Sequence, residues 1–186
     1  TGAFIVGDSL DYSLQQSVHK RLGNISHTIG GDNNYFSFKF IENLENKSKI
    51  YTAPLLSTNG FTVANGGKQK VKNVRILGVN ESFKKVSGSK FSYVLNENEV
   101  AISSNLADRL KVDTGDNILL KIKKISLMPE NTPFISANDL TISKRAKIVK
   151  ILDEDDLGRF NLNISQTAPN NLFLSIDWLN NIMALN

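Results

Sequence analysis

The order of hydrophobic patterns along the chain is the feature that most constrains its fold. Apolar residues at helical spacing open and close the 186-residue sequence, at 8–22 and 177–185. Between these segments, from residue 49 to about 124 and again at 145–152, apolar residues alternate or form the short runs typical of β-strands. Runs of strands with a few separated helices favour an α+β fold over a wound parallel sheet. We therefore predict an α+β fold with mixed β-sheet lobes, a long N-terminal amphipathic helix and a few short helices.

Turn residues divide this pattern further. Asn65-Gly66-Gly67 predicts a hairpin between strands at 61–64 and 71–79, because Asn and Gly accept positive φ at low cost. Ser103 or Ser104 is expected to cap a brief helix. We also expect a short polar strand at 24–29 and a second helix at 33–46.

The N-terminal segment is expected to be an amphipathic helix over 8–22. Asp8 or Ser9 can cap its start, and Gly23 can adopt the left-handed conformation that ends many helices. An apolar residue recurs every four positions and forms one stripe. The stripe consists of Leu10, Leu14, Val18 and Leu22.

Composition excludes several classes of protein. The sequence has no cysteine, which excludes disulfide scaffolds, cysteine zinc sites and cysteine nucleophiles. No apolar run reaches the length of a membrane span, and no signal peptide opens the chain.

The net charge is +4. The basic residues are scattered over strand-like segments without a basic helix or RNA-binding signature, so we expect solvated strand faces and no nucleic-acid partner. The main groups are Lys68, Lys70, Lys72 and Arg75; Lys84 and Lys85; Lys121, Lys123 and Lys124; and Lys144, Arg145, Lys147 and Lys150.

Gly7-Asp8-Ser9-Leu10 resembles the first block of the GDSL esterases, in which a serine is the nucleophile. That chemistry needs a histidine base hydrogen-bonded to the serine. The only histidines are His19 and His27, and the Asp-x-x-His block near the carboxyl end of that family is missing. His19 also lies roughly 15 Å from Ser9 along the same helix, at 1.5 Å per residue. Ser9 is therefore expected to be a helix-start residue, and an esterase using Ser9 is kept as an alternative.

The acidic run at 153–156 is the other candidate for chemistry. Asp153, Asp155 and Gly158 fit the first, third and sixth positions of a calcium-binding EF-hand loop. Leu157 and Ile164 occupy positions that need oxygen ligands, so a solvated turn is favoured over a metal site. Trp178, the only tryptophan, is expected to pack in the core. We predict no catalytic, cofactor-binding or metal-binding residues, and no cofactor.

Over most of its length the chain resembles the extracytoplasmic core domain of ABC transporter permeases of the FtsX/MacB-like class. The segments that carry the resemblance are the helix ending at Arg21-Leu22-Gly23, the Ala53-Pro54 step, Leu77-Gly78-Val79 and Gly158-Arg159-Phe160-Asn161-Leu162. The most telling unit is 98–120, in which a short strand, a Leu-Ala-containing helix, a Gly-Asp turn and another strand follow one another. In that class the N-terminal helix continues from a first membrane helix, so the chain would be a soluble region excised just after that span.

The resemblance implies a function and a location. The chain would be a periplasmic domain of a multi-pass protein at the extracytoplasmic face of the bacterial inner membrane. It would bind a substrate or partner and transmit ATP-driven movement, without being an enzyme itself. The implied partners are a separate cytoplasmic ABC ATPase, a second permease copy or half, and a periplasmic adaptor or lipoprotein.

Residues 1–186 would form a single domain, or two lobes with 50–165 as the strand-rich lobe. The apolar stripe would lock the N-terminal helix to the domain as a lever. A free-standing extracytoplasmic recognition module is the remaining alternative.

Overall fold

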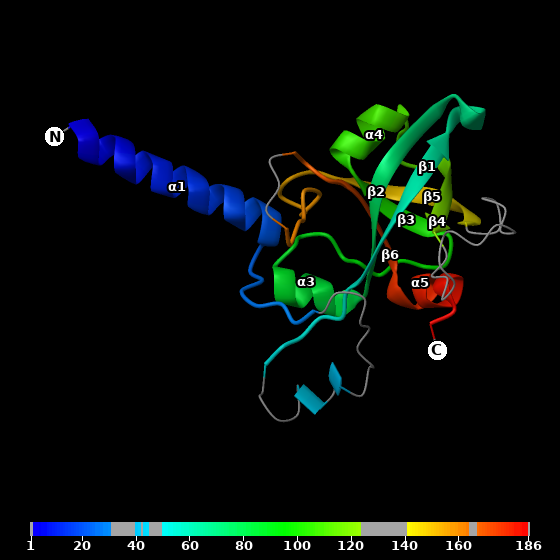
Figure 1. Cartoon of the computed structure of the whole chain (residues 1–186), viewed down its shortest axis with the longest axis horizontal. Coiled ribbons are helices and arrows are strands. Elements are labelled where there is room, and N and C mark those ends of the chain that lie inside the picture. The colour runs from blue at the N-terminus through cyan, green and yellow to red at the C-terminus, as the bar shows by residue number, and fades with distance from the viewer. Residues whose placement is uncertain are drawn as a thin grey trace, which may run out of the picture.

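The computed structural model describes residues 2–30, 40–41, 43–44, 50–123, 141–163 and 167–185 (Figure 1). Six strands are present in this part of the chain. They are β1 (Leu56–Ala64), β2 (Gln69–Val79), β3 (Glu99–Ser103), β4 (Asn117–Lys123), β5 (Thr141–Leu152) and β6 (Asn170–Ser175). The helices are α1 (Gly2–Leu22), α3 (Glu81–Ser87), α4 (Ser104–Leu110) and α5 (Ile176–Met183), with a 3₁₀ turn η1 at Asn65–Gly67.

The six strands close into a barrel in the order β1-β2-β6-β3-β5-β4, with β4 pairing back onto β1. Strands β2 and β6 are parallel, as are β3 and β5, and the remaining neighbours are antiparallel. The sheet is therefore mixed, as predicted. Its closure into a barrel leaves none of the six strands as an unpaired edge. The sequence pattern predicts lobes of mixed sheet but does not predict their closure into a barrel.

Alternate side chains of the strands fill the barrel, because successive residues of a strand point to opposite faces. In β2, Val74 and Ile76 are buried inside, whereas the intervening Arg75 lies on the outer face. Residues of two helices join the same core. They are Leu106, Ala107 and Leu110 of α4, and Ile176, Trp178, Leu179, Ile182 and Met183 of α5. Trp178 thus packs in the core, which confirms the prediction from sequence.

An aromatic cluster forms a second core on the outside of β2, β3 and β6. Phe83 of α3 meets Tyr93 and Phe160 edge to face, with ring centroids 5.0 and 5.2 Å apart. Phe173 of β6 lies beneath them and is fully buried. Such edge-to-face pairs add roughly 0.5–1.5 kcal/mol each beyond the burial of apolar area. The cluster joins α3, the segment at 88–98 and the turn at 153–163 to the barrel wall.

Local predictions from the sequence have mixed outcomes. The hairpin at Asn65–Gly67 and the helix after Ser103 are confirmed. The strand predicted at 24–29 is wrong, because residues 25–30 have no regular structure. The sequence analysis missed α3, which Asn80 caps by accepting a hydrogen bond from the Ser82 amide. The helix predicted at 33–46 falls largely outside the described residues.

Helix α1 differs from its prediction in two ways. It begins at Gly2, so Asp8 and Ser9 lie within the helix and do not cap it. Among the described side chains of the apolar stripe, Leu22 packs against the aromatic cluster, whereas Leu14 and Val18 are 63% and 50% exposed. The prediction of an amphipathic helix locked by its stripe is therefore not supported. Figure 1 shows the reason: most of α1 projects away from the barrel, and only its C-terminal end reaches other elements.

No helix in the described part of the chain has both the length and the apolar character needed to cross a membrane.

Candidate functional site: the seat of helix α1

The C-terminal end of α1 is held between two segments that lie far away in the sequence. Residues 20–24 contact the turn at 153–163 on one side and residues 87–89, at the end of α3, on the other. Figure 1 shows this junction where α1 meets the rest of the molecule. We call the three segments together the α1 seat. Among the described residues it is the place where movement of α1 could pass to the barrel.

Hydrogen bonds join α1 to the turn in both directions. The Arg21 guanidinium donates from Nη2 to the carbonyls of Asn163, at 2.8 Å, and Asn161, at 3.5 Å. The Asn161 amide donates back to the Arg21 carbonyl at 3.3 Å. The last four carbonyls of a helix have no partner within it, so this bond satisfies one that would otherwise stay open. Lys20 adds an ion pair, its Nζ lying 2.8 Å from Oε2 of Glu154.

The second side of the seat is a close backbone contact. Gly23 has φ +56°, which confirms the prediction that it supplies the left-handed residue after the helix. The Asn24 amide then donates to the Ser87 carbonyl at 2.8 Å. A Cβ atom on Gly23 would lie 2.1 Å from that same carbonyl oxygen, closer than any real contact. Only glycine lets the chain turn and approach Ser87 this closely.

The acidic run at 153–156 is a compact turn and not a chain of free carboxylates. Oδ1 of Asp153 accepts from the Asp156 amide at 3.0 Å, and the Asp153 carbonyl accepts from the Gly158 amide at 2.7 Å. Gly158 fits because it has no Cβ, which would lie 2.3 Å from the Leu152 carbonyl oxygen. Glu154 is shared between Lys20 and Arg159, the latter at 2.7 Å. The turn thus offers α1 a prearranged surface of carbonyls and one carboxylate.

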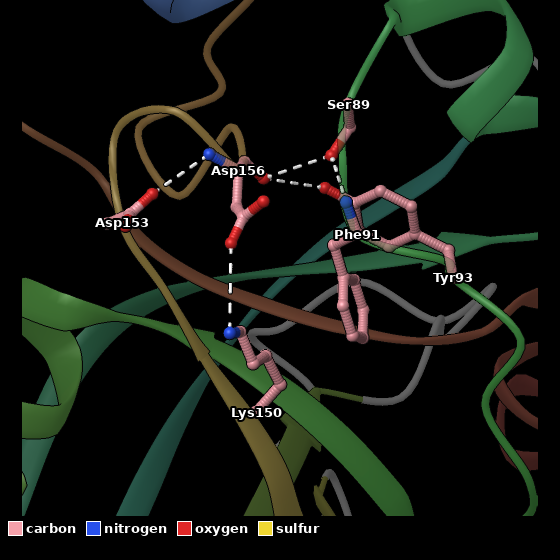
Figure 2. Close-up of polar contacts among 6 residues, drawn as sticks. All are labelled: Ser89, Phe91, Tyr93, Lys150, Asp153 and Asp156. Carbon is pink, nitrogen blue, oxygen red and sulfur yellow. Dashed lines mark hydrogen bonds and ion pairs between the residues drawn. The ribbon is translucent and has the colours of Figure 1, made fainter.

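Figure 2 shows how the turn is fixed to the segment at 88–98. The Asp156 carbonyl accepts from the Tyr93 hydroxyl at 3.0 Å and from the Ser89 hydroxyl at 3.4 Å. The Asp156 carboxylate faces Lys150 of β5 at 4.0 Å. Burial of Tyr93 raises the pKa of its hydroxyl well above the ordinary value, so the group remains a hydrogen-bond donor at physiological pH. The turn is therefore tied both to the aromatic cluster and to the barrel.

Asn161 is the junction of the seat. Its side chain is almost completely buried, and Oδ1 accepts from Nη1 of Arg75 and from the Asn163 amide. Its main chain carries the bonds to Arg21 described above. Nearby, Nδ2 of Asn171 in β6 donates to the carbonyls of Gly158 and Phe160, at 3.0 and 2.8 Å. One buried amide therefore links α1 to β2, and a second holds the turn on β6.

The ion pair in the seat shifts both of its pKa values. The hydrogen bond to Glu154 raises the pKa of Lys20, and the hydrogen bond from Lys20 lowers the pKa of Glu154. Both groups are open to solvent, so the pair is weak and screened by salt. The attachment of α1 therefore rests more on the hydrogen bonds of Arg21 and Asn24 and on the packing of Leu22 than on this ion pair.

The residues suggested by the esterase motif are not brought together in the described structure. Ser9 lies in the middle of α1, and its side chain is outside the described residues. His19 and His27 are both exposed, and the ring of His27 pairs with the neighbouring Ser26 hydroxyl at 3.0 Å. No cluster of three potential metal ligands occurs among the described residues.

Sequence reasoning missed the residues that form the junction. In the sequence, Arg75 is one of many lysines and arginines in strand-like segments, and Asn161 is one residue of the Gly158–Leu162 segment. One feature of the sequence points to Arg75 as a residue with a specific partner, because it is a cation between the apolar residues Val74 and Ile76. Its partner lies 86 positions away, so the pairing itself depends on the tertiary fold.

Comparison with known proteins adds information at the level of the fold. No family model and no curated protein matches the sequence. Among solved structures, the extracellular domain of the noncanonical ABC-type transporter YknZ from Gram-positive bacteria is similar, with TM-score 0.52 and 9% identity over 81% of this chain and 68% of that chain. The periplasmic region of MacB from Actinobacillus actinomycetemcomitans is similar with TM-score 0.51 and 12% identity, over 91% of this chain and 72% of that chain.

The chain has the fold of a MacB-like periplasmic core domain. The resemblance inferred from the order of its segments is thereby confirmed for the fold. The YknZ structure is the extracellular domain of an ABC-type transporter, and the MacB structure is a periplasmic region. Sequence identities of 9% and 12% support the shared fold alone, so the function of this chain is treated as a proposal.

Proposed function

We propose that this chain is the extracytoplasmic domain of an ABC transporter permease, and that it transmits ATP-driven movement through the α1 seat. The observation that carries the proposal is the contrast along α1. Its body is exposed, while its last residues are bonded to two distant segments. A helix attached in this way acts as a lever, because its free part can be moved while its fixed end carries the barrel.

In this mechanism the fixed end replaces the apolar stripe as the point of attachment. A cytoplasmic ATPase would shift the membrane spans, and the span that continues into α1 would tilt it. Arg21 and Gly23 would then pass the tilt to the 153–163 turn and to Ser87. From there Asn161 and the aromatic cluster would carry it to the barrel wall. The barrel would contact a second permease copy, an adaptor or a lipoprotein, and residues 1–186 would move as one domain or as two lobes.

Distance measurements on the intact permease test this mechanism. The 186-residue chain has no cysteine, so Ser13→Cys in α1 and Lys72→Cys in β2 are the only label sites within it, and any cysteine elsewhere in the permease is replaced first. Both positions are exposed. If α1 and the barrel move as one body, the distance distribution between the labels stays the same with and without trapped nucleotide. Arg21→Met should broaden it, while Gln15→Met, a matched change on the exposed part of α1, should leave it unchanged. A wild-type distribution that shifts with nucleotide would contradict the lever.

The alternatives make different predictions. An esterase requires a reactive Ser9, so stoichiometric labelling of Ser9 by a fluorophosphonate probe would support it against the transporter. A free-standing recognition module requires no membrane spans in the parent reading frame. The transporter proposal requires hydrophobic spans before Thr1 and after Asn186, and a frame without them would overturn it.

A further inference from the structure

A cavity of about 210 Å³ lies on the outer face of β1 and β2, next to the α1 seat. Its apolar lining comes from Leu55, Leu77, Phe160 and Leu162. Its polar lining comes from Ser57, Asn59, Arg75 and Asn163. The cavity is therefore amphipathic, with one cation among neutral groups. None of the lining residues is acidic.

Arg75 is the distinctive group in this cavity. Its guanidinium is half-buried and, within the described residues, makes one hydrogen bond, to Oδ1 of Asn161, and no ion pair. A guanidinium carries five N–H donors, and the described residues engage one of them. Partial burial strips water from the cation, and this desolvation lowers the pKa of Arg75, while no described residue supplies an anion. Charges taken out of water are stabilised by a counter-charge, and the planar guanidinium of arginine suits a carboxylate or a phosphate.

We propose that this cavity binds a carboxylate carried on a short, branched apolar group. The planar guanidinium matches a carboxylate in two parallel hydrogen bonds, and Asn59 and Ser57 provide neutral groups beside it. The apolar side chains of Leu77, Phe160 and Leu162 suit a body of the size of a leucine side chain. A cavity of about 150 Å³ already accommodates benzene, so the available volume is sufficient.

The position of Arg75 connects the cavity to α1. The same Asn161 that accepts from Arg75 also bonds to Arg21 through its main chain. A carboxylate that reorients the Arg75 guanidinium would change the hydrogen bonding of Asn161, and so the strength of the seat. This coupling rests on the proposed function of α1, whereas binding in the cavity does not.

Titration of the ¹⁵N-labelled 186-residue chain with 4-methylvalerate, followed by NMR, tests the binding. We expect saturable shifts at Asn59, Asn163 and the Arg75 side chain with Kd about 1 mM, the range of ligands with about eight non-hydrogen atoms. Arg75→Gln should weaken binding at least about tenfold, because the charge-assisted pair is lost. Arg145→Gln, which removes an exposed arginine of β5, should not change it.

A second pair of variants covers the case in which Arg75→Gln does not fold. Leu162 is 41% exposed, so substitutions there are compatible with the fold. Leu162→Asp places a carboxylate at the rim beside Arg75 and should abolish binding, while Leu162→Asn has nearly the same shape and should retain most of it.

Three outcomes would contradict parts of the proposal. Equal affinity for the neutral 4-methylvaleramide would show that the charge of the ligand does not contribute to binding. The same shifts with inorganic phosphate would show that the apolar group of the ligand is not recognised. Shifts that spread over the surface without saturation would show that the cavity is not a specific binding site. Coupling is measured separately, since bound 4-methylvalerate should change amide hydrogen exchange at residues 20–24. Binding without a change in exchange at residues 20–24 would support the binding site and contradict its coupling to α1.

Discussion

Helices α1 and α5 show how differently apolar residues are used in this molecule. In α5, Trp178, Leu179 and Ile182 are buried in the barrel core, so the helix is part of the folded domain. In α1, Leu14 and Val18 remain largely exposed, and the helix is held at one end by hydrogen bonds, a close backbone contact and the packing of Leu22. One helix is fixed along its length, whereas the other is fixed only at its end. Apolar spacing in the sequence therefore predicts a helix but does not say what it packs against.

The largest effect is expected from the same substitution made in the two helices. Leu179→Ala removes a fully buried side chain and should lower the free energy of unfolding by about 3 kcal/mol. Leu14→Ala should change it by less than about 0.5 kcal/mol, because Leu14 is exposed and alanine favours helix. Chemical denaturation of both variants measures the difference. A loss of more than about 2 kcal/mol for Leu14→Ala would show that α1 packs along its length.

The turn that receives α1 is the next most sensitive point. In Gly158→Ala, the new Cβ would lie 2.3 and 2.7 Å from the carbonyl oxygens of Leu152 and Asp153. Backbone atoms would have to shift, at a cost of about 2 kcal/mol. Gly30→Ala is a suitable control, since no atom of a described residue lies within 4 Å of its Cβ position. Thermal unfolding should separate the two variants, and equal stability would mean that the turn is less constrained than described.

A smaller effect is expected from Gly23→Ala, which detaches α1 without disturbing the barrel. The positive φ and the contact with the Ser87 carbonyl both oppose a side chain here. Because the seat can open while the barrel stays folded, the loss of global stability should be limited to about 1 kcal/mol. Faster amide exchange at residues 20–24, with unchanged exchange in β2 and β6, would be the specific result. Faster exchange throughout the barrel would contradict a local seat.

The smallest effect concerns the Lys20–Glu154 pair and depends on pH. The lowered pKa of Glu154 means that its contribution is present above about 4.5, its ordinary value, and is lost as pH falls through the lowered value. The raised pKa of Lys20 means that its contribution is present below 10.5 and is lost as pH rises through the raised value. Attachment of α1, measured by amide exchange at residues 20–24, should therefore be strongest between these limits. The pH dependence should weaken in about 1 M salt and disappear in Lys20→Met.

Part of this structure followed from local sequence, because local interactions specify it. The hairpin at Asn65–Gly67, the helix after Ser103 and the left-handed Gly23 depend on conformational preferences of a few adjacent residues. The α+β character and the burial of Trp178 followed from hydrophobic spacing. The order of segments also indicated the MacB-like fold, since it reflects the arrangement of whole strands and helices.

Only the tertiary structure decided how the barrel closes, which helix is buried and where the candidate site lies. Closure depends on β4 pairing with β1, and the junction depends on Arg75 meeting Asn161, both long-range contacts. The hydrophobic effect makes apolar residues seek burial, but it has no direction and does not select the partner. The stripe of α1 suggests packing along the helix, but among its described side chains only Leu22 packs against the domain. The attachment of α1 combines this contact with hydrogen bonds and a close backbone approach, which require the final arrangement of three distant segments.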